Sequence, residues 1–132
     1  MSMHIKINSV NAKYALLPGD PGRCSAIADR LDNLQHLAFN REYNSYLGYI
    51  DDTGVVVCST GIGGPSTAIA VEELAAAGIK TMLRIGTCGA MQPEIRGGDL
   101  IIAAAAYRHE GTSLHYAPIE YPAVANINVT NA

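Results

Sequence analysis

The sequence contains no tryptophan, one phenylalanine and only three cysteines among its 132 residues. The cysteines show neither CxxC spacing nor a Cys/His ligand pattern, which argues against a zinc site. Their odd number argues against a complete disulfide framework. Each lies in an apolar or glycine-rich stretch, so we expect Cys24, Cys58 and Cys88 to be reduced, small core residues.

The chain also lacks an excess of basic residues and any long apolar run. Its formal net charge is −3, and no basic patch is visible. A nucleic-acid or membrane-surface protein usually carries such a patch, so neither kind of partner is expected. We find no signal-peptide pattern and no run of 18 apolar residues that would span a bilayer. These absences favour a cytoplasmic protein.

What is present is a repeated unit in which an apolar strand opens into a glycine loop. Hydrophobic residues make up 48% of the chain, much of it Ala and Val, which suits buried strands and closely packed helices. The unit occurs at residues 14–23, 55–71 and 81–90, and Leu100–Tyr107 is the longest apolar run and a predicted central strand. Strands are also predicted over Tyr43–Ile50 and Thr81–Ile85, and a loop over Arg108–Asn126. The sequence therefore predicts an α/β fold with a mixed, largely parallel central sheet flanked by helices.

The stretch from Val55 to Val71 is the clearest of these units. Gly61, Gly63 and Gly64 permit positive φ and a close approach of backbone to a ligand. Pro65 suits the first position of the helix that follows. That helix is predicted to end at Gly78 and to turn Glu72 and Glu73 toward solvent or a partner. The amino end of such a helix favours an anion. A tight strand-to-helix connection without a ligand explains this stretch equally well.

Arginines at two of the three loops bear on that choice. Arg23 falls in the first turn of a predicted helix, where a cation is unfavourable beside the helix dipole unless an anion is bound. The alternative is an ion pair with Asp20. Arg84 falls at the carboxyl end of an apolar strand, where ligands gather in parallel sheets. It must hold an anion or pair with an acid such as Glu42 or Glu72.

Several nucleotide and hydrolase motifs are absent. A dinucleotide fingerprint fails because position 66 is Ser and no acid follows the next strand. No GK[ST] follows a glycine cluster, and neither Ser59 nor Ser66 lies in a GxSxG elbow. Two arginines at one sheet edge would suit a phosphate, which accepts bidentate guanidinium contacts. The residues themselves therefore indicate a phosphate-binding α/β domain.

Five motifs in order carry a resemblance to a known family. They are PGDPGR at 18–23, NRE at 40–42, CSTGIGGPS at 58–66, VEEL at 71–74 and LRIGTCGA at 83–90. Together they resemble the nucleoside phosphorylases of the hexameric type, and most closely the bacterial members that act on uridine. The similarity extends from about Ala15 to Ala125. It implies one nucleoside phosphorylase-like domain over residues 1–132, truncated on its C-terminal side, because family members are roughly twice as long.

The resemblance implies an activity and a set of site residues. The reaction would be phosphorolysis of a pyrimidine nucleoside, with uridine and phosphate giving uracil and ribose 1-phosphate. Arg84 and Thr87 would be catalytic. Phosphate would be bound by Gly19, Arg23, Arg84 and Thr87, and by Arg41 from the neighbouring subunit. The nucleoside would contact His4, Thr87, Cys88 and Gly89.

The resemblance also implies partners and cofactors. Inorganic phosphate would be the co-substrate, with no organic cofactor. A monovalent cation such as potassium would bind at Glu42, Ile62 and Ser66, at the interface of a homodimer that forms the site within a hexamer. In family members the second half of the chain recognises the base, and that half has no counterpart in these residues. A purine nucleoside phosphorylase and a non-catalytic phosphate-binding or interaction fragment therefore stay open as alternatives.

Overall fold

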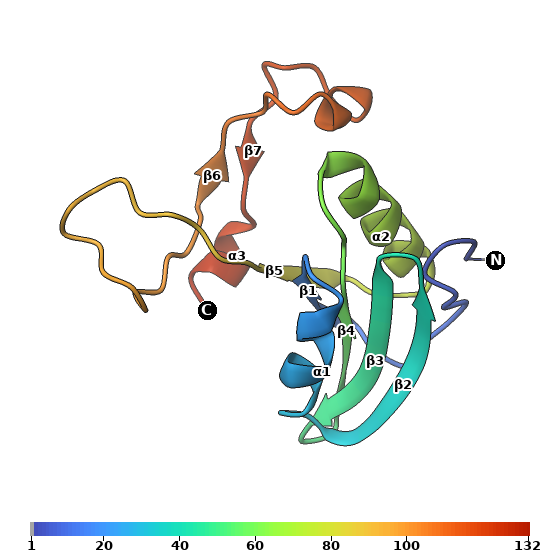
Figure 1. Ribbon diagram of the computed structural model, residues 1–132. Coiled ribbons are helices and arrows are strands. Elements are labelled where there is room, and N and C mark those ends of the chain that lie inside the picture. Colours follow the sequence, from blue (N-terminus) through green and yellow to red (C-terminus); the bar gives the residue numbers. More distant parts are fainter. Residues whose placement is uncertain (1) are drawn as a thin grey trace. The chain divides into compact units, whose positions relative to one another are not determined.

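The computed structural model describes residues 2–132, which form two compact units (Figure 1). The first ends at Gly86 and the second spans Thr87–Ala132. Each unit has its own sheet and is described by itself. The predicted single domain over residues 1–132 stays a prediction.

The first unit contains five strands and two helices. In chain order these are β1 (Tyr14–Pro18), α1 (Gly22–Ala28), β2 (Asp32–Asn40), β3 (Tyr43–Ile50), β4 (Thr53–Cys58), α2 (Gly64–Ala76) and β5 (Thr81–Ile85). The strands form one sheet in the order β2-β3-β4-β1-β5. Strand β1 pairs in parallel with β4 and β5, whereas β2, β3 and β4 form an antiparallel meander. The predicted mixed α/β fold is confirmed.

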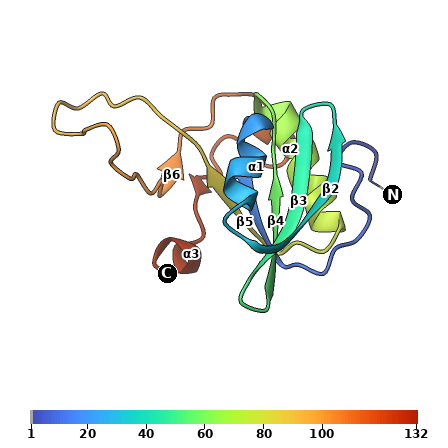
Figure 2. The same cartoon turned by 60° about the horizontal axis from the view of Figure 1, so that its bottom comes forward.

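Core side chains fill both faces of this sheet. On one face, alternate residues of β1 and β4, including Ala15, Leu17 and Val56, pack with Leu74 of α2. On the other face, Val57 packs with Cys24 and Ala28 of α1. Figure 2 shows α1 in front of the strands with α2 behind them. Because period-2 alternation places successive side chains on opposite faces, each strand supplies both layers.

The helices begin and end for local reasons. Pro21 caps α1, and the Asp20 carboxylate accepts a hydrogen bond from the Gly22 N–H at 2.9 Å, so the helix starts one residue later than Asp20 capping would give. Gly63 caps α2, followed by Pro65 in the first turn. Gly78, with φ +113°, follows the end of α2 as predicted, since few other residues adopt this conformation.

The second unit contains little regular structure. Its elements are β6 (Ala105–Ala106), the 3₁₀ helix η1 (Thr112–His115), β7 (Ala123–Val124) and α3 (Ile127–Thr130), with β6 and β7 antiparallel. The predicted central strand over Leu100–Tyr107 is wrong. Only two of its residues pair with a neighbouring strand, and Leu100 is 89% exposed. Apolar runs form central strands only where strands flank them on both sides.

The cysteine prediction is correct for two of the three residues. Cys24 and Cys58 are buried and free, whereas Cys88 is free but exposed. Burial raises the pKa of Cys58 to about 12 and also raises that of Cys24. Cys88 lies in the second unit, in the glycine-rich segment that follows β5. This segment does not pack against a core, so the assignment of Cys88 to the core is wrong.

Candidate functional site

The carboxyl ends of the parallel strands β1, β4 and β5 meet at one edge of the first sheet. Pro18 lies opposite Ile85 in the ladder, and Leu17 opposite Arg84. The loop after β4 is hydrogen-bonded to the loop after β1, from Thr60 N–H to the Pro18 carbonyl and from Gly61 N–H to the Gly19 carbonyl, both at 2.9 Å. The carboxyl ends of the three strands and the first two glycine loops therefore converge as the sequence predicts.

Arg84 is an exposed cation near the carboxyl end of β5, the outer strand of the sheet. Its Nη1 donates to the carbonyls of Leu17 at 3.2 Å and Ile85 at 2.6 Å. No carboxylate of residues 2–132 pairs with its guanidinium, so the alternative of an ion pair with Glu42 or Glu72 is not found. These two carbonyls orient the guanidinium but do not neutralise its positive charge. A bound anion would neutralise it.

Gly19 lets the guanidinium approach the loop after β1. A β-carbon at position 19 would lie 3.0 Å from Arg84 Nη2 and 3.4 Å from the Gly61 carbonyl oxygen. Because Gly19 has no side chain, the loops after β1 and β4 and the Arg84 guanidinium can approach one another closely. A methyl group at this position would require the end of the Arg84 side chain to move.

Arg23 lies in the first turn of α1, at the same edge as the loop after β1. Its side chain is half-buried, and within residues 2–132 it makes no hydrogen bond or ion pair. Asp20 does not pair with it, because the Asp20 carboxylate accepts instead from the Gly22 N–H. The proposed surface ion pair is therefore absent, and the unfavourable position of a cation beside this helix end persists.

The turn between β2 and β3 is fixed to the loop after β4. The Ser59 hydroxyl donates to the Glu42 carbonyl at 2.6 Å and accepts from the Asn44 N–H at 2.8 Å. Arg41 occupies this turn with φ +55°, exposed and without a side-chain partner in the described chain. Arg41 therefore lies on an exposed turn that hydrogen bonds join to the loop after β4, and its role in a neighbouring subunit stays a prediction.

The three residues predicted to hold a cation lie close together. The Ser66 hydroxyl donates to the carbonyls of Ile62 at 2.9 Å and Gly63 at 3.1 Å. A β-carbon on Gly61 would lie 2.6 Å from Glu42 Cγ and 3.3 Å from Ser66 Oγ, so these two side chains flank the same glycine. A carboxylate, a hydroxyl and a carbonyl are all oxygen ligands suited to a hard cation.

His4 lies at a different place, against α2. Its Nδ1 is 2.7 Å from Glu73 Oε1, and the Asn40 side-chain amide donates to the His4 carbonyl at 2.7 Å. Asn40 ends β2 and directly precedes Arg41. The two residues that the resemblance assigns to a neighbouring subunit, His4 and Arg41, are therefore linked through Asn40.

Thr87, Cys88 and Gly89 belong to the second unit, and all three are exposed. A β-carbon on Gly89 would meet no atom within 4 Å. Their roles in binding phosphate or nucleoside stay predictions.

Comparison with known proteins places this geometry in a family. The sequence profile of the Phosphorylase superfamily matches residues 13–132. The chain belongs to this superfamily. It is 57% identical over 121 residues to a uridine phosphorylase of Haemophilus influenzae, which covers 92% of this chain and 48% of that protein. It is 55% identical to a uridine phosphorylase of Thermococcus kodakarensis, with 92% of this chain and 44% of that protein covered.

A third relative is named for a purine nucleoside rather than for uridine. This phosphorylase-superfamily chain is 52% identical over 112 residues to a guanosine phosphorylase of Halorubrum lacusprofundi, which covers 85% of this chain and 46% of that protein. The chain thus spans about half the length of the curated relatives it matches. None of the helices within residues 2–132 is long and apolar enough to cross a membrane.

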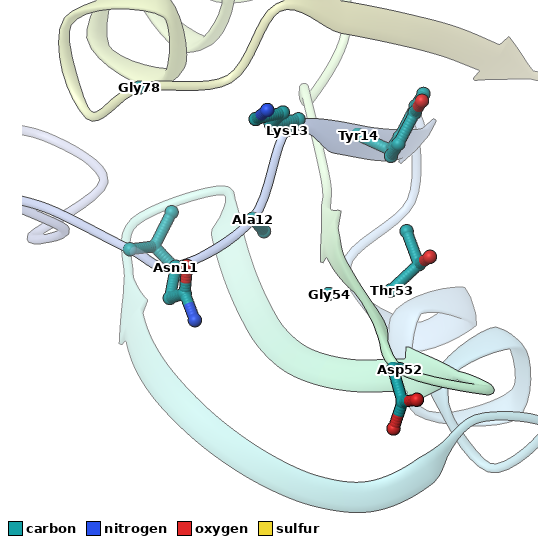
Figure 3. Close-up of a pocket in the computed structure, with 9 residues that line it drawn as sticks. Asn11, Ala12, Lys13, Tyr14, Asp52, Thr53, Gly54 and Gly78 are labelled. Carbon is teal, nitrogen blue, oxygen red and sulfur yellow. The ribbon is translucent and has the colours of Figure 1, made fainter.

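One pocket of the superfamily chain lies away from the site. Its volume is about 510 Å³, and its lining comes from the residues before and at the start of β1, the turn before β4 and Gly78 (Figure 3). These are the amino ends of β1 and β4, opposite to the edge that carries Arg84. Ligands of open α/β sheets bind at the carboxyl ends, so this pocket is not the candidate site.

The sequence did not reveal the hydrogen-bonding roles of Glu73 and Ser59. Glu73 was expected to face solvent or a partner, yet it accepts hydrogen bonds from the N-terminal segment. Burial raises its pKa, but hydrogen bonds from Ser2, Ile5 and His4 outweigh burial and lower it to about 2. A signal was available, because Glu73 lies three residues after the buried Ala70 and four before the buried Ala77, on the helix face toward the core.

Proposed function

We propose that the protein to which this sequence belongs cleaves uridine with inorganic phosphate, and that this chain supplies the phosphate-binding part of the site. One observation carries the proposal. An arginine without a carboxylate partner lies over a glycine loop at the carboxyl edge of a parallel sheet, in a chain more than half identical to uridine phosphorylases. Phosphate is the anion whose geometry matches a guanidinium fork.

The residues would act by positioning and by charge. Arg23 and Arg84, with Gly19 and Thr87, would hold the phosphate beneath the anomeric carbon, and Arg41 of a neighbouring copy would complete its neutralisation. A phosphate oxygen forms the new bond to that carbon as the glycosidic C–N bond breaks. The bonding electron pair leaves with uracil, which takes up a proton. Fixed orientation and preorganised charge together account for a large part of such a rate increase.

The nucleoside would contact Thr87, Cys88, Gly89 and the His4 of a neighbouring copy. This arrangement requires a homo-oligomer in which a dimer forms the site, with a hexamer as the family's assembly. A monovalent cation such as potassium would bind the oxygens of Glu42, Ile62 and Ser66, and no organic cofactor takes part. The free thiols of Cys24, Cys58 and Cys88 support a cytoplasmic location.

The proposal is tested by phosphate binding and by turnover. Calorimetry on the chain is expected to detect phosphate binding that Arg84→Ala weakens about tenfold or more, roughly 1.4 kcal/mol. Arg30→Ala is the matched control, because Arg30 is exposed and its side chain makes no hydrogen bond or ion pair within residues 2–132. Phosphate-dependent release of uracil from uridine supports the enzyme. Binding without release indicates a non-catalytic phosphate-binding module, and unchanged binding by Arg84→Ala removes the phosphate assignment.

A purine nucleoside is the second candidate substrate. The 52% identity to a guanosine phosphorylase favours it, because that relative matches nearly the same part of the chain as the uridine phosphorylases do. The same assay with guanosine and inosine separates the two. Release of a purine base without release of uracil would move the assignment to the purine enzymes.

A further inference from the structure

We propose that Glu73 is a positioning residue for His4: its carboxylate holds the N-terminal segment, residues 2–5, on α2 and fixes the imidazole with Nδ1 inward and Nε2 outward. The idea deepens the proposed function and rests on it only for what the outward nitrogen would meet, a hydroxyl group of the nucleoside in a neighbouring copy. Neither the family match nor the names of the relatives assigns a role to Glu73.

The contacts around Glu73 converge from one short segment. Its two carboxylate oxygens accept hydrogen bonds from the Ser2 hydroxyl and from the backbone N–H groups of Met3 at 3.2 Å, His4 at 3.1 Å and Ile5 at 2.9 Å. The His4 ring adds Nδ1 at 2.7 Å. One side chain on α2 thus satisfies the polar groups of four successive residues. Surface glutamates that serve only solubility do not gather donors in this way.

The segment is held on its other side by the core. Ile5 is fully buried and Ile7 is 5% exposed, and both pack in the cluster that includes Leu74 and Ala77 of α2. Between them Lys6 adopts φ +61°, which turns its side chain outward while the two isoleucines point inward. The backbone of residues 4–7 is therefore fixed relative to α2, and the carboxylate acts on a segment that is already in place.

The chemistry of the carboxylate decides the state of the imidazole. An ionised carboxylate only accepts hydrogen bonds, so the nitrogen that faces it must carry a proton. Nδ1 is then a donor in the neutral ring as well as in the protonated one. In the neutral ring Nε2 is left as the acceptor, and a hydroxyl group is the donor that it suits. The His4 side chain is 30% exposed, so the imidazole is only partly covered by the chain.

A second contact fixes the backbone of His4. The Asn40 amide donates to the His4 carbonyl at 2.7 Å, joining the segment to the end of β2 beside Arg41. Glu73 and Asn40 belong to different elements, α2 and β2, so the backbone from which the ring extends is held from two sides. Side chains held in this way are the ones that keep a binding geometry precise.

The test is the tautomer of His4, read by nitrogen-15 NMR on the histidine-labelled chain at a pH where the ring is neutral. His4→Asn assigns its signals among the four histidines. Wild type is expected to show a proton on Nδ1 and none on Nε2. Glu73→Ala is expected to lose that preference, and Glu73→Gln to weaken it. Glu72→Gln is the matched control, because Glu72 is exposed on the same helix without a side-chain contact in the described chain.

The outcomes are distinct from those of the phosphate experiment. A wild-type His4 with its proton on Nε2, or an unchanged Nδ1 proton in a folded Glu73→Ala, overturns the positioning role. If Glu73→Ala does not fold, a Glu73→Gln spectrum identical to that of wild type does so. Phosphate binding is expected to be unchanged in all Glu73 variants. The His4 tautomer can therefore be read by NMR whether or not the chain binds phosphate.

Discussion

The guanidinium of Arg84 lies against the backbone of Gly19, with Nη2 only 3.0 Å from where a β-carbon would stand. The two residues belong to neighbouring loops at the carboxyl ends of β1 and β5. The Leu17 carbonyl also accepts a hydrogen bond from Arg84 Nη1, so the arginine side chain is held by β1, the strand next to its own. The position of the cation thus depends on the absence of a side chain at residue 19.

Gly19→Ala is therefore expected to weaken phosphate binding by about tenfold, roughly 1.4 kcal/mol, because the methyl group displaces the guanidinium. Stability should change by less than about 1 kcal/mol, since the far end of an arginine side chain can move. Calorimetry with inorganic phosphate and thermal unfolding measure the two effects. Gly97→Ala is the control, because a β-carbon at residue 97 meets nothing within 4 Å. Equal phosphate affinity in both variants would contradict this account of the Arg84 position.

Gly61→Ala is expected to destabilise the first unit more than Gly63→Ala does. Both glycines have positive φ, +69° and +92°, so both substitutions carry a backbone cost of about 1–3 kcal/mol. At residue 61 the new methyl group would also lie 2.6 Å from Glu42 Cγ, whereas at residue 63 its nearest neighbour is 3.8 Å away. Overpacking should add about 1–3 kcal/mol at residue 61. Denaturant unfolding measures the difference, and equal midpoints would show that Glu42 yields freely.

Acid is expected to destabilise the chain partly through Glu73. Its pKa is about 2 in the folded protein, below the ordinary value of 4.5. A depressed carboxyl pKa stabilises the fold fully above the unfolded value, and that stabilisation is lost as the pH falls through the folded value. The unfolding free energy of wild type should therefore drop between about pH 4.5 and pH 2 more steeply than that of Glu73→Gln. Parallel pH profiles for the two proteins would refute the assignment.

Arg108 is expected to hold the loop of the second unit. It is 8% exposed, and its guanidinium donates to the carbonyls of Ser113, Ala117, Pro118 and Tyr121 at 2.5–2.7 Å. Arg108→Gln leaves most of these carbonyls without their donor, which is expected to loosen the loop. Hydrogen exchange should accelerate over residues 112–121 and stay unchanged in Arg96→Gln, an exposed control. Equal exchange in both variants would mean that the loop does not depend on Arg108.

The sequence was sufficient where local pattern and tertiary pairing agree. Tyr43–Ile50 and Thr81–Ile85 form strands with the predicted bounds, because alternation and apolar runs there coincide with available partners. Arg84 was predicted to lie at the carboxyl edge from its place in an apolar strand, and it does. Its lack of an acidic partner could not be predicted, since it depends on where distant carboxylates lie after folding.

The errors have physical causes as well. The apolar run at Leu100–Tyr107 has strand composition, but β-structure requires a neighbouring strand along its whole length, and only Ala105 and Ala106 have one. Glu73 looked like a solvated charge because its five donors come from residues some seventy positions earlier. Arg108 was expected in a loop, but no periodicity reveals that a loop folds around one guanidinium.

The hydroxyl of Ser59 joins the turn at Arg41 to the loop at Gly61 through hydrogen bonds. It bridges the Glu42 carbonyl and the Asn44 N–H, and Gly61 in turn donates to Gly19. In the proposed dimer, Arg41 serves the neighbouring site while Gly19 belongs to the chain's own. Movement of the loop at Gly61 would then also move the turn at Arg41, because the Ser59 hydroxyl bonds to both sides of that turn.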